Sequence, residues 1–265
     1  MMQGIYQGIP SADYHNLTDY VSNSYLSRLD KCPAAGKVPL KETDALVHGG
    51  ALHSLLLEGM DAFNKGYLVP PYKLDLRKNS DKEFAADVTA AGLTLISQDV
   101  FDRMKHVVDA VYSHPTASVL MREGLSEQTV FWTDPETGLP CKCRPDRIPS
   151  GDKGVIIDFK KTRDAGYEAF TNACARYKYF IQSALYLDGY NIASGKTADA
   201  FVFIAAELEA PFRVEVYAMA EDFIEVGRRE VRRLLQIEKA CREGGYYPHY
   251  VTKDIREIYC PAWIK

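Results

Sequence analysis

The chain has 265 residues, of which 46% are hydrophobic and 26% are charged, and its formal net charge at pH 7 is −4. This composition is typical of a soluble globular protein with a sizeable core, and it excludes a disordered or low-complexity chain. No apolar run approaches the roughly 18 to 20 residues of a membrane span, and the first ten residues do not resemble a leader. We therefore expect a cytoplasmic protein without membrane contact.

The six cysteines include no C-x-x-C pair, which argues against a zinc ribbon. They also lack the four-cysteine grouping that holds an iron–sulfur cluster, so we expect reduced thiols. Charge is distributed unevenly along the chain, because nine Lys or Arg and five Asp or Glu lie between Cys141 and Lys178. A locally basic cleft on an acidic protein is compatible with nucleic-acid binding.

The N-terminal part, residues 1–120, is predicted to be mainly helical. An irregular stretch is followed by a short helix that Ser22 or Ser24 caps. A second helix is predicted from about Thr43 to Glu58, because its apolar residues recur at helical spacing, and it carries His53. Further elements are predicted as a strand at 67–71 and helices at 82–90 and 98–113.

His53 lies in the sequence GGALHSLLLE that starts at Gly49. The glycine pair permits a close backbone approach or a bend in the helix. A single histidine on a helix is more often a core or surface residue than a metal ligand. His48 is an alternative candidate on the same helix, so the helix alone leaves the assignment open.

The predicted core, residues 121–245, begins with a hairpin. Residues 128–133 alternate as a strand, 134–138 form a turn, and a strand over 139–148 returns and delivers Asp146. Glu127, at the start of the first strand, is either a third acid of the site or an exposed strand-end residue.

The central motif runs from Cys141 and reads CKCRPDRIPSGDKGVIIDFKKT. Its Pro-Ser-Gly-Asp turn, residues 149–152, folds the strand after Asp146 back onto the next one. In that next strand Asp158 and Lys160 share one face under the two-residue repeat of a strand. A carboxylate and an ammonium group are therefore expected side by side at the end of an apolar strand.

Buried charges of this kind are costly unless they pair or bind a metal ion. Mg²⁺ prefers oxygen ligands, and Asp146 with Asp158 supplies two carboxylates. Lys160 can then hold, and help to deprotonate, a water that attacks a phosphodiester. Asp-x-Lys alone is more often an ion pair on an edge strand, so the surrounding motifs decide between the two interpretations.

After Lys160, helices are predicted at 164–175 and 177–190. The second helix carries Gln182 and Tyr186, which share a face because they are four residues apart. Strands at 200–207 and 213–218 and a long helix at 220–243 follow. The long helix has a row of arginines that either follows phosphates or is a solvated face: Arg228, Arg229, Arg232 and Arg233.

Asp146 in Arg-Pro-Asp, followed by Asp158-Phe159-Lys160, resembles the signature of the PD-(D/E)xK nuclease superfamily. His53 in its glycine-containing segment resembles the G-x-x-x-H motif of the RecB-like branch, and Gln182 with Tyr186 its Q-x-x-x-Y motif. The resemblance implies an α/β fold with a restriction-endonuclease-like core, in which helices flank a central mixed β-sheet, and an N-terminal helical extension. We expect one domain over residues 1–265, with a tail from 246.

The same resemblance implies roles for individual residues. Mg²⁺ is the expected cofactor, with Mn²⁺ as a substitute. The expected metal ligands are His53, Asp146, Asp158, the backbone carbonyl of Phe159 and, on weaker grounds, Glu127. The expected catalytic residues are Asp146, Asp158, Lys160, Gln182 and Tyr186.

Residues 4–250 are similar to the RecE type of this superfamily, exonuclease VIII of prophages, through Gly4-Ile5-Tyr6, Asp13-Tyr14-His15 and the hairpin at 132–138. This implies degradation of double-stranded DNA from 5′ ends, 3′ single strands for an annealing protein, and a ring-like trimer or tetramer around the duplex. Lys161 departs from the pattern, since those enzymes usually carry Thr there. The alternative is a catalytically impaired nuclease-fold module that binds DNA within a phage complex.

Overall fold

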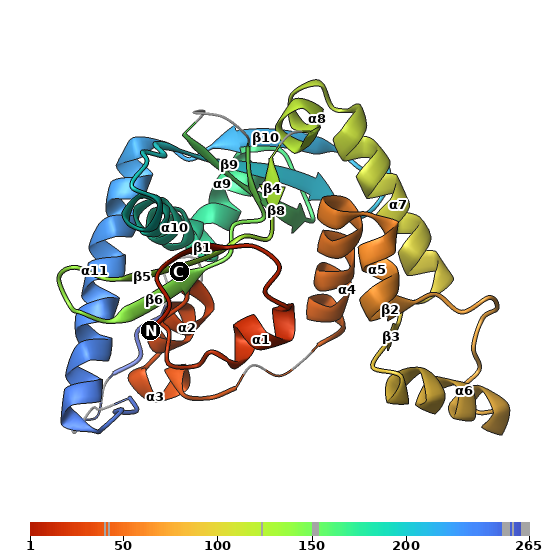
Figure 1. Cartoon of the computed structure of the whole chain (residues 1–265), viewed down its shortest axis with the longest axis horizontal. Helices are drawn as coiled ribbons and strands as arrows, with labels where there is room; N and C mark the ends of the chain where they lie inside the picture. The colour runs from red at the N-terminus through yellow and green to blue at the C-terminus, as the bar shows by residue number, and fades with distance from the viewer. Residues whose placement is uncertain are drawn as a thin grey trace.

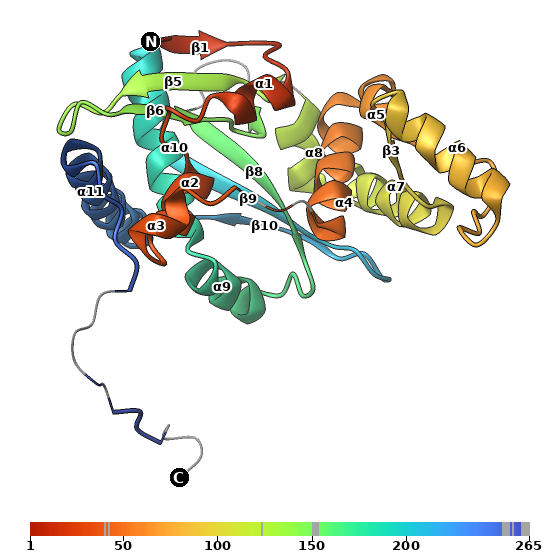
Figure 2. The same cartoon turned by 90° about the horizontal axis from the view of Figure 1, so that it is seen from below.

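The computed structural model describes residues 1–39, 41, 43–122, 124–149, 154–250, 255 and 257–260. Its central element is a mixed sheet with the strand order β10-β9-β8-β7-β4 and helices on both faces (Figure 1, Figure 2). The predicted fold class is therefore confirmed. The strands are β4 (Leu125–Ser126), β7 (Arg147–Ile148), β8 (Val155–Thr162), β9 (Ala200–Glu207) and β10 (Val214–Ala218).

Strands β8 and β9 form the only parallel pair of this sheet within the described residues. Ile156 of β8 belongs to one hydrophobic core, whereas Ile157 and Phe159 belong to a second core on the opposite face. A parallel pair covered on both sides needs apolar residues on both faces. This explains the nearly continuous apolar run that precedes Asp158.

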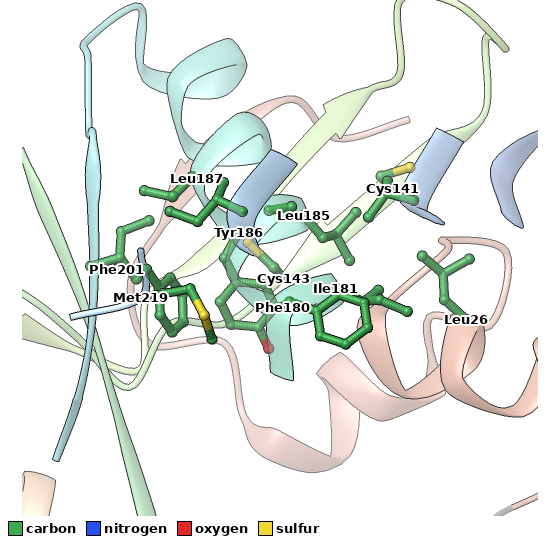
Figure 3. Close-up of a cluster of buried hydrophobic side chains, with 14 of the residues drawn as sticks. Leu26, Cys141, Cys143, Phe180, Ile181, Leu185, Tyr186, Leu187, Phe201 and Met219 are labelled. Carbon is green, nitrogen blue, oxygen red and sulfur yellow. The ribbon is translucent and has the colours of Figure 1, made fainter. Parts of the chain in front are cut away.

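The first core lies between the sheet and helices α2 (Asn23–Leu29), α9 (Tyr167–Arg176), α10 (Tyr179–Ser194) and α11 (Glu221–Gly244). Helix α10 is buried along most of its length, and Figure 3 shows Ile181, Leu185 and Tyr186 packed among side chains of neighbouring elements. Because a helix buried on all sides faces little water, its polar side chains must find partners inside the protein.

A second, antiparallel sheet contains β1 (Gly4–Tyr6), β5 (Thr129–Thr133) and β6 (Pro140–Cys143). It packs on α10, which therefore lies between two sheets. The approach is close, because a Cβ at Gly189 of α10 would lie 2.5 Å from the Trp132 ring of β5.

The second core is covered by α4 (Asp44–His53), η1 (Ser54–Glu58), α5 (Met60–Gly66), α7 (Gln98–Ser113) and α8 (Pro115–Arg122). Helix α6 (Asn79–Ala90) lies outside this layer, beside the short parallel pair of β2 (Tyr67–Leu68) and β3 (Thr94–Leu95) (Figure 1). Within the described residues, no helix combines the length and hydrophobicity that a membrane crossing requires.

The predicted strand over 139–148 is wrong in one respect, because it is two strands in two sheets. Strand β6 pairs with β5, whereas β7 pairs with β8 and β4. Pro145 lies between them and has no N–H group for a ladder hydrogen bond, so the strand breaks there. Residues 150–152 of the predicted turn, and Trp263 of the predicted tail, lie outside the described residues.

The N-terminal part contains more helix than expected. Helices α1 (Ser11–Asn16), α3 (Pro33–Gly36), α5 and α8 were not predicted, and the expected strand at 67–71 has two residues. The single helix expected to Glu58 changes to a π-helix after His53. These segments are short, so packing against the sheet outweighs their weak sequence signals.

Candidate active site

Two chain segments cross from one sheet to the other at the same level of the molecule. The first runs from β4 into β5 through Glu127, and the second runs from β6 into β7 through Asp146. Glu127 has a left-handed backbone, with φ 53°, and its N–H donates to the Asp146 carbonyl oxygen at 3.2 Å. A non-glycine residue in this conformation is sterically unfavourable and common at functional sites. The crossing therefore brings two carboxylates together.

Asp146 is buried, and its two carboxylate oxygens have different neighbours. Oδ2 accepts a hydrogen bond from the Phe159 N–H of β8 at 2.7 Å. Oδ1 lies 3.5 Å from Nδ1 of His53. One oxygen thus fixes the side chain to the central strand, while the other faces the imidazole.

His53 is the last residue of α4 and reaches the sheet from its second face. Its ring meets the Phe159 ring edge to face, with centroids 5.6 Å apart. The π-helix η1 begins at the next residue, and such turns often occur at functional sites. His48, the alternative on this helix, is not in the group that His53 forms with the two acids.

His53, Glu127 and Asp146 each offer one ligand atom, and these atoms lie within 4.8 Å of one another. Two carboxylate oxygens and an imidazole nitrogen are a donor set that suits a divalent cation. Glu127, which was predicted as a metal ligand on weaker grounds than the other residues, therefore lies inside this group. Asp158 lies outside it but is near enough to Asp146 for their charges to interact.

Burial and the charges of neighbouring residues shift the pKa values of all three residues in this group. Burial lowers the pKa of His53, but the neighbouring carboxylates, chiefly Asp146, together outweigh burial and raise that pKa to about 9. Burial, and then Asp146, raise the pKa of Glu127 to about 8. Burial alone would raise the pKa of Asp146, but protonated His53 lowers it below its ordinary value.

Asp158 and Lys160 project from the other face of β8, as the two-residue repeat predicts. Their side chains form an ion pair, and both contact Gln182 of α10. Lys160 Nζ donates to Gln182 Oε1 at 2.9 Å, and Gln182 Nε2 donates to Asp158 Oδ1 at 2.5 Å. The glutamine thus satisfies a carboxylate and an ammonium group at the same time.

Burial also shifts the pKa values of Asp158 and Lys160. It raises the pKa of Asp158 to about 6, and the Lys160 ammonium offsets only part of the effect. Burial lowers the pKa of Lys160, but Asp158 and Asp146 outweigh it and raise that pKa above its ordinary value. Lys160 therefore stays protonated at neutral pH and acts as a cation and hydrogen-bond donor.

Tyr186 is buried one turn beyond Gln182 on α10, and its ring packs edge to face on Phe201, with centroids 6.1 Å apart (Figure 3). Sequence reasoning missed Tyr179 on the same helix face, whose ring centroid lies 4.8 Å from Lys160 Nζ. Residues 179, 182 and 186 have the i, i+3, i+7 spacing of one helix face, and that signal could have identified Tyr179.

The predicted arginine row on α11 is largely neutralised by acidic neighbours. Arg228 pairs with Asp188, Glu221 and Glu225. Arg232 pairs with Glu136, and Arg233 pairs with Asp30 and Glu230. This face therefore resembles a solvated ion-pair network more than a phosphate-binding surface.

A family model described as a PDDEXK-like domain of unknown function (DUF3799) matches residues 22–254. The chain belongs to this family. The match covers His53 and the other site residues discussed above, and it supports the PDDEXK nuclease superfamily without singling out the RecE type. No curated protein matches the chain by sequence.

The PDDEXK-like fold is also found among solved structures. A crystal structure described as a "putative exonuclease" from Eubacterium rectale is 16% identical, covers 95% of this chain and 97% of its own, and has a TM-score of 0.58. At this identity the likeness concerns the fold alone. A structure of SSO0001, with 16% identity, 76% and 89% coverage and a TM-score of 0.31, is too distant to add to this.

Binding of a divalent cation to this PDDEXK-like protein should depend on pH. In the metal-free protein, His53 and Glu127 carry protons at pH 7, and both must lose them to act as ligands. Binding therefore releases protons, and the apparent Mn²⁺ affinity should rise from pH 7 to about pH 9. Calorimetry in buffers of different ionisation enthalpy measures both quantities.

The matched variants for this experiment are His53→Ala and His48→Ala, on the same helix. We expect His53→Ala to weaken Mn²⁺ binding at least about tenfold and to reduce the proton release. His48→Ala should bind as the wild type does. Equal affinity in both variants would remove His53 from the set of ligands.

Proposed function

We propose that this protein is a metal-dependent exodeoxyribonuclease that degrades linear double-stranded DNA in the 5′ to 3′ direction and leaves 3′ single strands. The observation that supports it best is the meeting of two groups at β8. His53 and Glu127 lie beside Asp146, which is hydrogen-bonded to the strand through the Phe159 N–H, and Asp158, Lys160 and Gln182 form the second group. The similarity to RecE-type enzymes supports the DNA substrate and the polarity.

His53, Glu127, Asp146 and Asp158 are the residues that would hold Mg²⁺, or Mn²⁺ in its place. The burial of Asp146 and Asp158 supports this assignment, because buried carboxylates are costly without a compensating cation. Such a cation supplies electrostatic stabilisation for the negative charge that builds up on a phosphate during hydrolysis.

Lys160 and Gln182 have the positioning role in this proposal. The raised pKa of Lys160 keeps it cationic, so it can donate hydrogen bonds to the attacking water or to a phosphate oxygen. Gln182 holds the ammonium group and the Asp158 carboxylate in one arrangement through its two amide atoms. The Tyr179 ring under the ammonium adds cation–π stabilisation.

The proposal predicts a specific pattern of DNA digestion. With Mg²⁺, a linear duplex labelled at its 5′ ends should lose the label early as small products, while a label at the 3′ ends is retained. A covalently closed circular duplex should stay intact, and EDTA should abolish the reaction. Gel electrophoresis of the labelled products measures each outcome.

Two outcomes would contradict the proposal in different ways. Nicking of the closed circle would indicate an endonuclease that uses the same residues. Failure to hydrolyse DNA with either Mg²⁺ or Mn²⁺, together with retained DNA binding, would favour the catalytically impaired DNA-binding module.

A further inference from the structure

A groove of about 860 Å³ lies next to the candidate active site. The end of β8, helix α9 and the first residue of α10 contribute to its lining. Tyr179 belongs both to this lining and to the contacts of Lys160, so the groove leads to the Lys160 ammonium group. Its volume is within the range of about 300 to 1,000 Å³ that is usual for ligand sites.

A row of two stacked aromatic rings between two cationic groups leads from Lys160 along the groove. The Tyr179 ring lies under Lys160, and the Tyr177 ring is stacked on Tyr179 with centroids 5.7 Å apart and planes 28° apart. The Arg176 guanidinium lies 5.6 Å from the Tyr177 centroid. Tyr177 is 59% exposed, so much of its ring is accessible from solvent.

The backbone between the two tyrosines is strained. Lys178 has a left-handed conformation, with φ 55°, which is unfavourable for a residue with a side chain. Its ammonium pairs with Asp30 of the neighbouring helix layer, and this ion pair helps to retain the conformation. The strained residue connects α9 to α10 and lies between the two stacked rings.

The groove also has an excess of unpaired positive charge. Its lining includes Lys161, Arg163 and Arg176, and none of these forms an ion pair within the described part of the chain. Each of the two acids of the lining pairs with an arginine outside it that also pairs with another acid, Glu207 or Asp99. Asp164 pairs with Arg213 at 3.3 Å, and Glu209 pairs with Arg103 at 3.4 Å. The groove therefore favours a polyanion.

We propose that this groove binds a single-stranded segment of the DNA substrate, with a base stacked on Tyr177 and phosphates near Lys161, Arg163 and Arg176. Stacking on an exposed ring requires an unpaired base, because the bases of a duplex are already stacked on each other. Cations beside aromatic rings are the combination that single-strand binding proteins use. The assignment of the bound strand to the DNA substrate rests on the proposed function, whereas the binding of single-stranded DNA by the groove does not.

The test measures binding of a short fluorescent oligodeoxythymidylate by polarisation, in EDTA and in the Asp158→Asn background, so that cleavage cannot interfere. Tyr177→Ala should weaken binding roughly 5- to 100-fold. Tyr177→Phe should bind like its parent, since it keeps the stacking face. Arg176→Gln should lower the slope of log affinity against log salt by about 0.7.

Tyr167→Ala is the matched control, because Tyr167 is an exposed tyrosine at the start of α9, whereas Tyr177 follows its end, and Tyr167 is not part of the groove lining. Circular dichroism checks that each variant is folded. Unchanged binding by Tyr177→Ala, or an equal loss in Tyr167→Ala, would overturn the proposal. An equal loss of binding to a blunt duplex would overturn the assignment to a single strand.

The same measurements separate this inference from the proposed function. If the wild-type protein hydrolyses no DNA but Tyr177→Ala still weakens single-strand binding, the groove is supported and the nuclease activity is contradicted. Conversely, DNA hydrolysis by the wild-type protein, together with single-strand binding that Tyr177→Ala leaves unchanged, would support the nuclease and contradict the groove.

Discussion

Asp158→Asn is expected to lower the rate of DNA hydrolysis by at least about 10³-fold, equivalent to about 4 kcal/mol of transition-state stabilisation. The asparagine has the size of the aspartate and can still accept the hydrogen bond from Gln182, so the protein should fold. It cannot, however, provide the negative charge that Lys160 and a divalent cation require. Initial rates on linear duplex with Mg²⁺ measure the loss.

Lys160→Met should cause a loss of similar size, because it removes the only cation that pairs with Asp158 among the described residues. Two exposed residues at the opposite end of the sheet provide matched controls. Asp199→Asn and Lys196→Met repeat the same chemical changes and should retain full activity. Wild-type rates in either active-site variant would mean that the chemistry occurs elsewhere.

Gly227→Ala is expected to destabilise the protein by about 3 kcal/mol or more. A Cβ at this position of α11 would lie 2.1 Å from the backbone carbonyl oxygen of Phe180 in α10. The contact is with main chain, so no side-chain rotation relieves it, and the two helices must separate. The melting temperature should fall by roughly 6 to 12 °C, measured by differential scanning calorimetry.

Gly244→Ala tests whether this effect comes from packing or from the loss of glycine in a helix. Gly244 is the last residue of the same helix, and nothing lies within 4 Å of a Cβ at that position. Alanine there should leave stability unchanged or raise it by about 0.5 to 1 kcal/mol. A similar loss of stability in both variants would contradict the packing explanation.

The local pattern of the sequence was sufficient for the central strands. Residues 200–207 were predicted as a strand and form β9, and the shared face of Asp158 and Lys160 followed from the two-residue repeat. These predictions succeed because the side-chain direction in a strand depends on sequence parity alone. The meeting of His53 with Asp146 required the family resemblance, since no local rule relates residues so far apart in the chain.

The sequence could not predict which sheet each half of the predicted strand over 139–148 joins. Alternating residues fit either sheet equally well, so only Pro145 marked the break that isolates Asp146. The position of Glu127 depends on the same crossing. A glycine there would have indicated a left-handed backbone in the sequence, but a glutamate gives no such signal. The π-helix after His53 is likewise a tertiary effect, since its residues also fit an ordinary α-helix.

The crossing of the two segments between the sheets affects how this site can change in evolution. Glu127 and Asp146 are positioned by main chain at one end of the β5–β6 hairpin, and the turn at 134–138 lies at the other end. Residues inserted in that turn would lengthen a surface loop and leave both acids in place. One residue inserted within β5 would shift its register and turn every later side chain to the opposite face. Length variation among homologues should therefore be frequent at the turn and absent from the strands beside the acids.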